Sequence, residues 1–137
     1  LWSRSSSKED IKPEKELRLA KVYEAAQHVK GTKQSSLLYE AAVIERTLGN
    51  TDNAAATITA ALVANPNNFQ MRLMHIDLAL ASGDMTTAKK EIDWCLLRRP
   101  DSQKLQGRIQ RLKQLRIEQA SMPTALNKSV GTPGARR

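Results

Sequence analysis

Apolar residues recur along the chain at intervals of three and four, the spacing that places them on one side of an α-helix. The pattern predicts six helices, separated by short polar segments that contain Gly, Pro, Asn and Ser. A leading helix is expected over residues 13–30 and a trailing helix over residues 101–119. Between them, residues 35–68 and residues 69–102 should each form a helix pair. Because the connecting segments are short, consecutive helices should pack antiparallel.

Local signals mark the expected helix ends. Pro13 suits the first turn of the leading helix, where the missing N–H would have had no partner. Gly31 is expected to end that helix. Ser35 or Ser36 can then cap the next helix through a hydroxyl oxygen.

The two helix pairs superimpose on each other at a shift of 34 residues. The recurring positions hold a Gly, small or branched apolar residues, and a Pro: Gly49, Ala54, Ile58, Ala61 and Pro66, then Gly83, Ala88, Ile92, Cys95 and Pro100. Gly tolerates positive φ where the chain reverses, Ala lets helix backbones approach closely, and Pro stops a helix. A period of this length is typical of solenoids built from helix pairs, which bind partners over an extended surface.

The pattern resembles the tetratricopeptide repeat (TPR) family, over residues 35–100. That family repeats two antiparallel helices, with Gly in the turn between them, a small residue five positions later and Pro after the second helix. The family's preferred Trp is Leu38 in one copy and Arg72 in the other, and its preferred Tyr is Glu45 and Ala79. The resemblance implies an all-α fold, a short right-handed α-α superhelix of two divergent repeats completed by the flanking helices.

The resemblance also implies that the first helix of each pair lines a concave groove that holds the partner. By position, the groove residues are Tyr39, Val43, Arg46 and Thr47 from one repeat, and Gln70, Leu73, Asp77 and Leu80 from the other. This set lacks the Lys and Asn residues with which chaperone-binding members clamp a C-terminal carboxylate. A mostly apolar groove suits an amphipathic helix or an extended segment of another protein. The alternative, that the leading helix or another subunit fills the groove, stays open.

Positive charge is concentrated after the repeats. Residues 35–100 carry six Lys/Arg and seven Asp/Glu, whereas residues 101–137 carry eight and two. The cations of the trailing helix form the expected basic surface: Lys104, Arg108, Arg111, Lys113 and Arg116. Such a surface suits nucleic acid, anionic lipid or an acidic protein, or it only keeps this end of the chain soluble. Nucleic acid is the less favoured partner, because residues 101–137 contain no aromatic residue on which a base could stack.

Catalytic chemistry is not expected from this sequence. Cys95 is the one cysteine, and it should be a small buried thiol, since the first repeat has Ala61 there. His28 and His75 lack the spacing of metal ligands, and no nucleophile–base pair or phosphate-binding loop is recognisable. We therefore expect no enzyme activity, no metal and no cofactor. Trp94 either covers a hydrophobic seam or anchors a partner.

Three segments are expected: a flexible arm over residues 1–12, a helical domain over residues 13–120 and a basic flexible tail over residues 121–137. No apolar run is long enough to span a membrane, so a soluble domain is expected. The start at Leu1-Trp2 leaves the location open between the cytoplasm and a tethered position beside a membrane. The expected function is a protein–protein interaction scaffold or adaptor within a multi-subunit complex. The alternative is a basic module that associates with an anionic membrane or nucleic acid.

Overall fold

The computed structural model describes residues 8–121 of the chain. These residues form six α-helices and no strand: α1 (Lys8–Ala26), α2 (Gly31–Thr47), α3 (Thr51–Ala64), α4 (Phe69–Ser82), α5 (Met85–Arg98) and α6 (Gln103–Ala120). The prediction of an all-α fold is confirmed for this part of the chain. The first seven residues of the expected arm, and residues 122–137 of the expected tail, lie outside the described residues.

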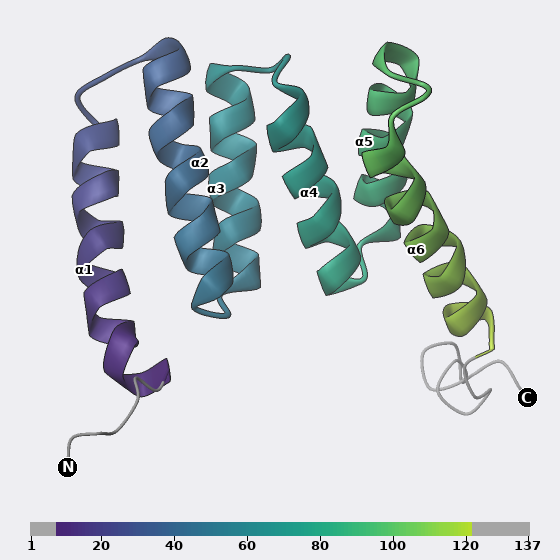
Figure 1. Cartoon of the computed structure of the whole chain (residues 1–137), viewed down its shortest axis with the longest axis horizontal. Helices are drawn as coiled ribbons and strands as arrows, with labels where there is room; N and C mark the ends of the chain where they lie inside the picture. Colours follow the sequence, from purple (N-terminus) through teal and green to yellow (C-terminus); the bar gives the residue numbers. More distant parts are fainter. Residues whose placement is uncertain (1–7, 122–137) are drawn as a thin grey trace, which may run out of the picture.

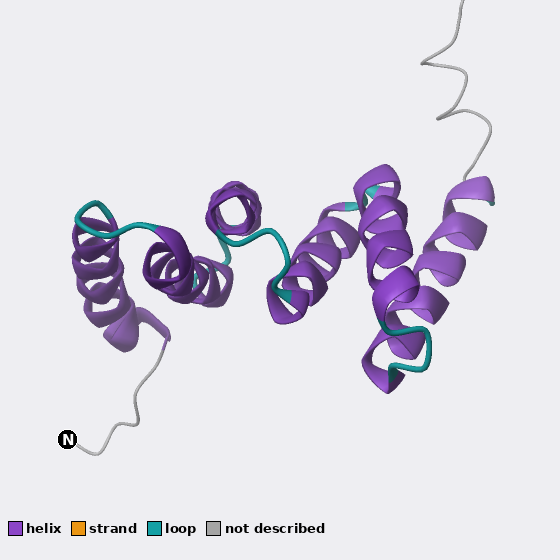
Figure 2. Cartoon of the chain, turned by 90° about the horizontal axis from the view of Figure 1, so that it is seen from above, coloured by secondary structure: helices purple, strands orange, loops and turns teal. Residues whose placement is uncertain are grey.

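Consecutive helices run antiparallel and pack against each other in chain order (Figure 1). Viewed from above, they form a row rather than a closed bundle (Figure 2). One further contact joins α4 directly to α6, the next helix that runs in the same direction. Because α4 therefore contacts α3, α5 and α6, it is the helix with neighbours on the most sides.

The start of the row differs from the prediction in two places. α1 begins at Lys8, five residues before the predicted start, so Pro13 lies inside the helix rather than at its first position. Gly31, with φ of +66°, opens α2 instead of ending the leading helix, which stops at Ala26. Ser35 is consequently inside α2, where it is buried and its hydroxyl donates to the Thr32 carbonyl. A Gly with positive φ can either end one helix or begin the next, and the local sequence does not distinguish the two cases.

The other turns follow the predicted pattern. Gly49 and Gly83 both adopt positive φ, +86° and +78°, a conformation that costs a Gly little. The side chains of Asn68 and Asp84 accept hydrogen bonds from backbone N–H groups in the first turns of α4 and α5. Each of these turns therefore sets the start or end of a helix by local chemistry.

The hydrophobic core runs along the row in three clusters. Ala54 and Ala88, at matching repeat positions, are fully buried, as expected for residues that allow close helix packing. The cluster at the α1–α2 end is small and contains Val22, Ala41 and Ile44. The other two clusters are larger, and one of them joins α4, α5 and α6 around Leu73, Ile76, Ile92 and Leu105. Each helix therefore buries its apolar side against its neighbours in the row.

Candidate functional site

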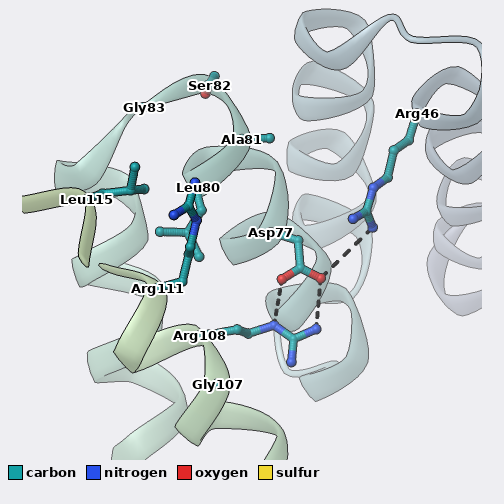
Figure 3. Close-up of a pocket in the computed structure, with 10 residues that line it drawn as sticks. All are labelled: Arg46, Asp77, Leu80, Ala81, Ser82, Gly83, Gly107, Arg108, Arg111 and Leu115. Carbon is teal, nitrogen blue, oxygen red and sulfur yellow. Dashed lines mark hydrogen bonds and ion pairs between the residues drawn. The ribbon is translucent and has the colours of Figure 1, made fainter. Parts of the chain in front are cut away.

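An open hollow of about 740 Å³ is bordered by α2, α4 and α6 (Figure 3). We call it the α4–α6 hollow. Its lining comes from one residue of α2, the second half of α4 with the glycine that follows, and one side of α6: Arg46, Asp77, Leu80, Ala81, Ser82, Gly83, Gly107, Arg108, Arg111 and Leu115. Four of these ten, Arg46, Asp77, Arg108 and Arg111, carry a charge. The lining of the hollow is therefore more polar than the mostly apolar groove that the sequence predicted.

Asp77 and Arg108 form the fixed ion pair at the centre of this hollow. Arg108 Nε donates to Asp77 Oδ1 at 2.7 Å, and Arg108 Nη2 donates to Asp77 Oδ2 at 2.8 Å. Arg108 Nη1 also donates to the Lys104 carbonyl at 2.6 Å. Both partners of the pair are about a quarter exposed. A bidentate pair held in this way positions the guanidinium rigidly and joins α4 to α6.

Two further guanidinium groups face the hollow. Arg46 Nη1 lies 3.9 Å from Asp77 Oδ2, an ionic contact too long for a hydrogen bond, and its side chain is half exposed. Arg111 makes no ion pair with any described residue and is exposed. The lining thus has three cations and one carboxylate, and the carboxylate is already hydrogen-bonded to Arg108. The excess positive charge makes the hollow attractive to anionic groups.

Gly107 is a lining residue that sequence reasoning missed. It lies in the middle of α6, where Gly is less favourable than Ala. A Cβ added there would meet no atom within 4 Å, so no neighbour in the structure requires Gly at this position. The sequence offers only a weak signal, because a single Gly inside a predicted helix, here over residues 101–119, is tolerated and does not by itself indicate a site.

The predicted groove residues do not all line the α4–α6 hollow. Arg46, Asp77 and Leu80 line it, whereas Tyr39 and Gln70 line a smaller separate pocket. Val43 and Thr47 are exposed on α2 and line neither of these two pockets; the Thr47 hydroxyl donates to the Val43 carbonyl. The hollow therefore takes in three of the eight predicted groove residues.

The position of Leu73 contradicts its predicted role as a groove residue. Its side chain is 1% exposed and lies in the core cluster with Ile76 and Leu105, so the prediction that it contacts a partner is wrong. The reason is that α4 is packed against three other helices, which leaves few of its positions open. Leu80, also buried at 8% exposure, reaches only the edge of the hollow.

The predicted basic surface is also divided. Arg108 is paired with Asp77, so its charge is largely neutralised locally. Lys104 and Arg111 lie four residues before and three after Arg108, which places them on the same side of α6. Lys113 lies about 140° round the helix from Arg108, since each residue turns the helix by roughly 100°. Lys113 and Arg116 are exposed but do not line the hollow.

A second charged cluster joins the α3–α4 turn to α5. Arg72 Nη1 donates to both carboxylate oxygens of Glu91, at 2.8 and 3.1 Å, and Arg72 Nη2 donates to the Pro66 carbonyl. The Glu91 side chain is only 5% exposed. Burial raises the pKa of Glu91, but the neighbouring His75 and Arg72 outweigh that effect and hold the pKa below its usual value. This cluster is a structural tie between helices.

Trp94 belongs to the same region. Its ring packs against the core cluster of α4, α5 and α6, and two guanidinium groups lie over it, Arg72 at 4.4 Å and Arg98 at 3.7 Å from the ring centre. Such stacking is a cation–π interaction. Of the two roles considered for Trp94, the structure favours the one in which it covers a hydrophobic seam.

The described residues contain neither a reactive thiol nor a cluster of metal ligands. Cys95 is fully buried, as predicted, and burial, with a smaller effect of Glu91, raises the pKa of its thiol to about 11. Within residues 8–121, no group of three His, Cys, Asp or Glu side chains could hold a metal ion. In the same part of the chain, no helix combines the length and apolar character needed to cross a bilayer.

The resemblance to the TPR family comes from the sequence pattern of this chain and not from a match to a known protein. It rests on the sequence repeat at 34 residues, in which Gly49 matches Gly83 and Ala54 matches Ala88. A scan against protein-family models, a search of curated proteins and a search of solved structures each find no match to this chain.

Proposed function

We propose that this chain is a short TPR-like solenoid that acts as a protein–protein interaction scaffold within a larger assembly. The solenoid proposal is supported by the row of antiparallel helices and by the turn glycines, Gly49 and Gly83, at matching repeat positions. The hydrogen bond between Tyr23 and Thr57, which are separated by the same 34 residues, supports α1 as the second helix of a degenerate first repeat.

The α4–α6 hollow is the feature that best supports a binding function. Its residues come from α2, α4 and α6, which are the first helices of successive pairs in the proposed repeat. It offers exposed hydrogen-bond donors on Arg46 and Arg111 beside the partly exposed apolar side chain of Leu115. Such a mixture of aliphatic and charged groups on an open surface suits a polypeptide segment better than a small molecule, whose sites are typically concave and largely apolar.

A basic module for membranes or nucleic acid has less support. Lys113 lies on a different side of α6 from Lys104, Arg108 and Arg111, and Arg108 is paired with Asp77. Trp94, one of the aromatic residues on which a base could stack, is covered by Arg72 and Arg98. Because of these arrangements, the basic side chains of α6 do not form one continuous positively charged surface.

Site-specific crosslinking tests the scaffold proposal. A photo-crosslinking amino acid would replace Ser82, an exposed residue of the hollow lining, or Val63, an exposed residue of α3 that does not line the hollow. In extract from the source cells, we expect position 82 to crosslink to a defined protein and position 63 not to do so. Equal labelling at the two positions, or crosslinks only to nucleic acid or lipid, would contradict the proposal.

A further inference from the structure

We propose that the α4–α6 hollow recognises an acidic segment of the partner protein, through the side-chain carboxylates of Asp or Glu. This inference rests on the proposed function and names the chemistry of the partner. Arg111 is the main contact, Arg46 assists it, and Gly107 is the place where the backbone of the segment lies against α6.

The charges of the hollow are complementary to those of an acidic segment. Asp77 is the one carboxylate of the lining, and both of its oxygens accept hydrogen bonds from Arg108. Arg46 approaches Asp77 only to 3.9 Å, and Arg111 has no ionic partner among the described residues. Two guanidinium groups therefore keep donors free for a ligand. Guanidinium groups pair with carboxylates through two parallel hydrogen bonds, which gives both strength and orientation.

The fixed pair of Asp77 and Arg108 contributes rigidity rather than binding capacity. It holds α6 against α4 through two short hydrogen bonds that come from residues 31 positions apart. Arg111, one turn further along α6 than Arg108, is thus placed over the hollow without being tied down. Because the helix that carries Arg111 is already held in place, binding has to order the Arg111 side chain but not its backbone.

Gly107 gives the partner segment room to approach α6. The fold does not need Gly there, because a Cβ would extend into open space. Gly nevertheless occupies a helix position where Ala would be more favourable, on the side of α6 that lines the hollow. A residue without a Cβ lets another backbone approach closely. An extended segment that passes over Gly107 would bring its side chains within reach of Arg111.

The chain's own C-terminal segment is not a suitable occupant. Residues 122–137 contain Lys128, Arg136 and Arg137 and no Asp or Glu, so they carry the same sign of charge as the hollow. Like charges at short distance repel. We therefore take a segment of another protein as the occupant.

Fluorescence anisotropy with the full chain tests the inference. The probe is a labelled short peptide in which Glu and Asp alternate with Leu, blocked at both ends so that it has no terminal carboxylate. We expect it to bind, with affinity that falls as salt rises, and we expect a peptide with Gln and Asn in place of the acids not to bind. Arg111→Gln should weaken binding about tenfold, the effect of one charge-assisted hydrogen bond. Gly107→Val should weaken binding without loss of helical content.

Lys113→Gln is the matched control, because it removes one exposed cation from another side of the same helix. We expect it to change affinity less than twofold. Equal weakening by Lys113→Gln and Arg111→Gln, tight binding of the neutral peptide, or displacement of the probe by an oligonucleotide at equal charge would overturn the inference. A requirement for a free C-terminal carboxylate on the peptide would also overturn it.

The two proposals can fail separately. If position 82 crosslinks to a protein but the acidic peptide does not bind, the scaffold function stands and the acidic segment is wrong. If neither result is obtained, both are wrong. Far-ultraviolet circular dichroism of every variant confirms that a loss of binding does not come from unfolding.

Discussion

The phenol oxygen of Tyr23 lies 2.6 Å from the hydroxyl oxygen of Thr57, 34 residues later in the chain. The same phenol donates a hydrogen bond to Glu45 Oε2. One side chain of α1 is thus connected to α2 and α3 together. Glu45 and Thr57 are buried, and burial, with help from Glu45, raises the pKa of Tyr23. At the end of the row where the apolar cluster is smallest, this polar contact holds the first helix in place.

Replacing Tyr23 should therefore destabilise the chain. Tyr23→Phe removes the donor to the Glu45 carboxylate, whose Oε1 already has no hydrogen-bond partner among the described residues. We expect a loss of about 1–3 kcal/mol in the free energy of unfolding, the cost of leaving a buried polar group unsatisfied. Urea unfolding followed by circular dichroism measures it. Tyr39→Phe is the control, since Tyr39 is only partly buried and its hydroxyl makes no hydrogen bond with a described residue.

Equal loss in the two tyrosine variants would show that the contact with Glu45 and Thr57 does not stabilise the fold. A double variant, Tyr23→Phe with Glu45→Gln, separates the two groups further. Because the two residues are in contact, their effects should not add.

Acid should weaken the fold through Glu91. The pKa of Glu91 in the folded chain is below its ordinary value of 4.5, so the folded state prefers the ionised form. The stabilisation it contributes is present above pH 4.5 and is lost as pH falls through the lowered folded pKa. Glu91→Gln should flatten the dependence of unfolding free energy on pH in this window. Asp93→Asn, on the exposed side of α5, should leave the profile close to that of the wild type.

The thiol of Cys95 should be unreactive in the folded chain. Only the thiolate is a nucleophile, and burial raises the pKa of this thiol to about 11. At pH 8, we expect a maleimide to label the native chain very slowly and the urea-unfolded chain at the rate of an ordinary cysteine. Rapid labelling of native chain, with no change in its circular dichroism, would contradict the buried position of Cys95.

Gly107→Ala should stabilise the chain, in contrast to most substitutions. Ala is favoured over Gly inside a helix by about 0.5–1 kcal/mol, and the added Cβ has room. Gly83→Ala is the matched comparison, because Gly83 has φ of +78° at the end of α4 and an Ala there is strained. Thermal unfolding of both variants should show a higher midpoint for the first and a lower midpoint for the second. A lower midpoint for Gly107→Ala would mean that Gly107 has a role within the fold itself.

The local features of the fold were accessible from the sequence. Apolar spacing predicted each of the described helices, and Gly49 and Gly83 marked reversals that the structure confirms. Gly31 shows the limit of such signals: it lies at a reversal but on the opposite side of it from the predicted one. Which helix a turn residue belongs to depends on where the neighbouring helices must pack, and this is not encoded within a few residues.

The helices, their turns and the burial of Ala54 and Ala88 follow from local sequence, because helical periodicity and backbone freedom act over a few residues. Tertiary packing is what encloses Leu73 among core residues and pairs Arg108 with Asp77, 31 residues earlier. It also decided that Gly107 faces a hollow with Arg111. These relationships depend on which sides of α4 and α6 meet, and that choice is made by the packing of the whole row.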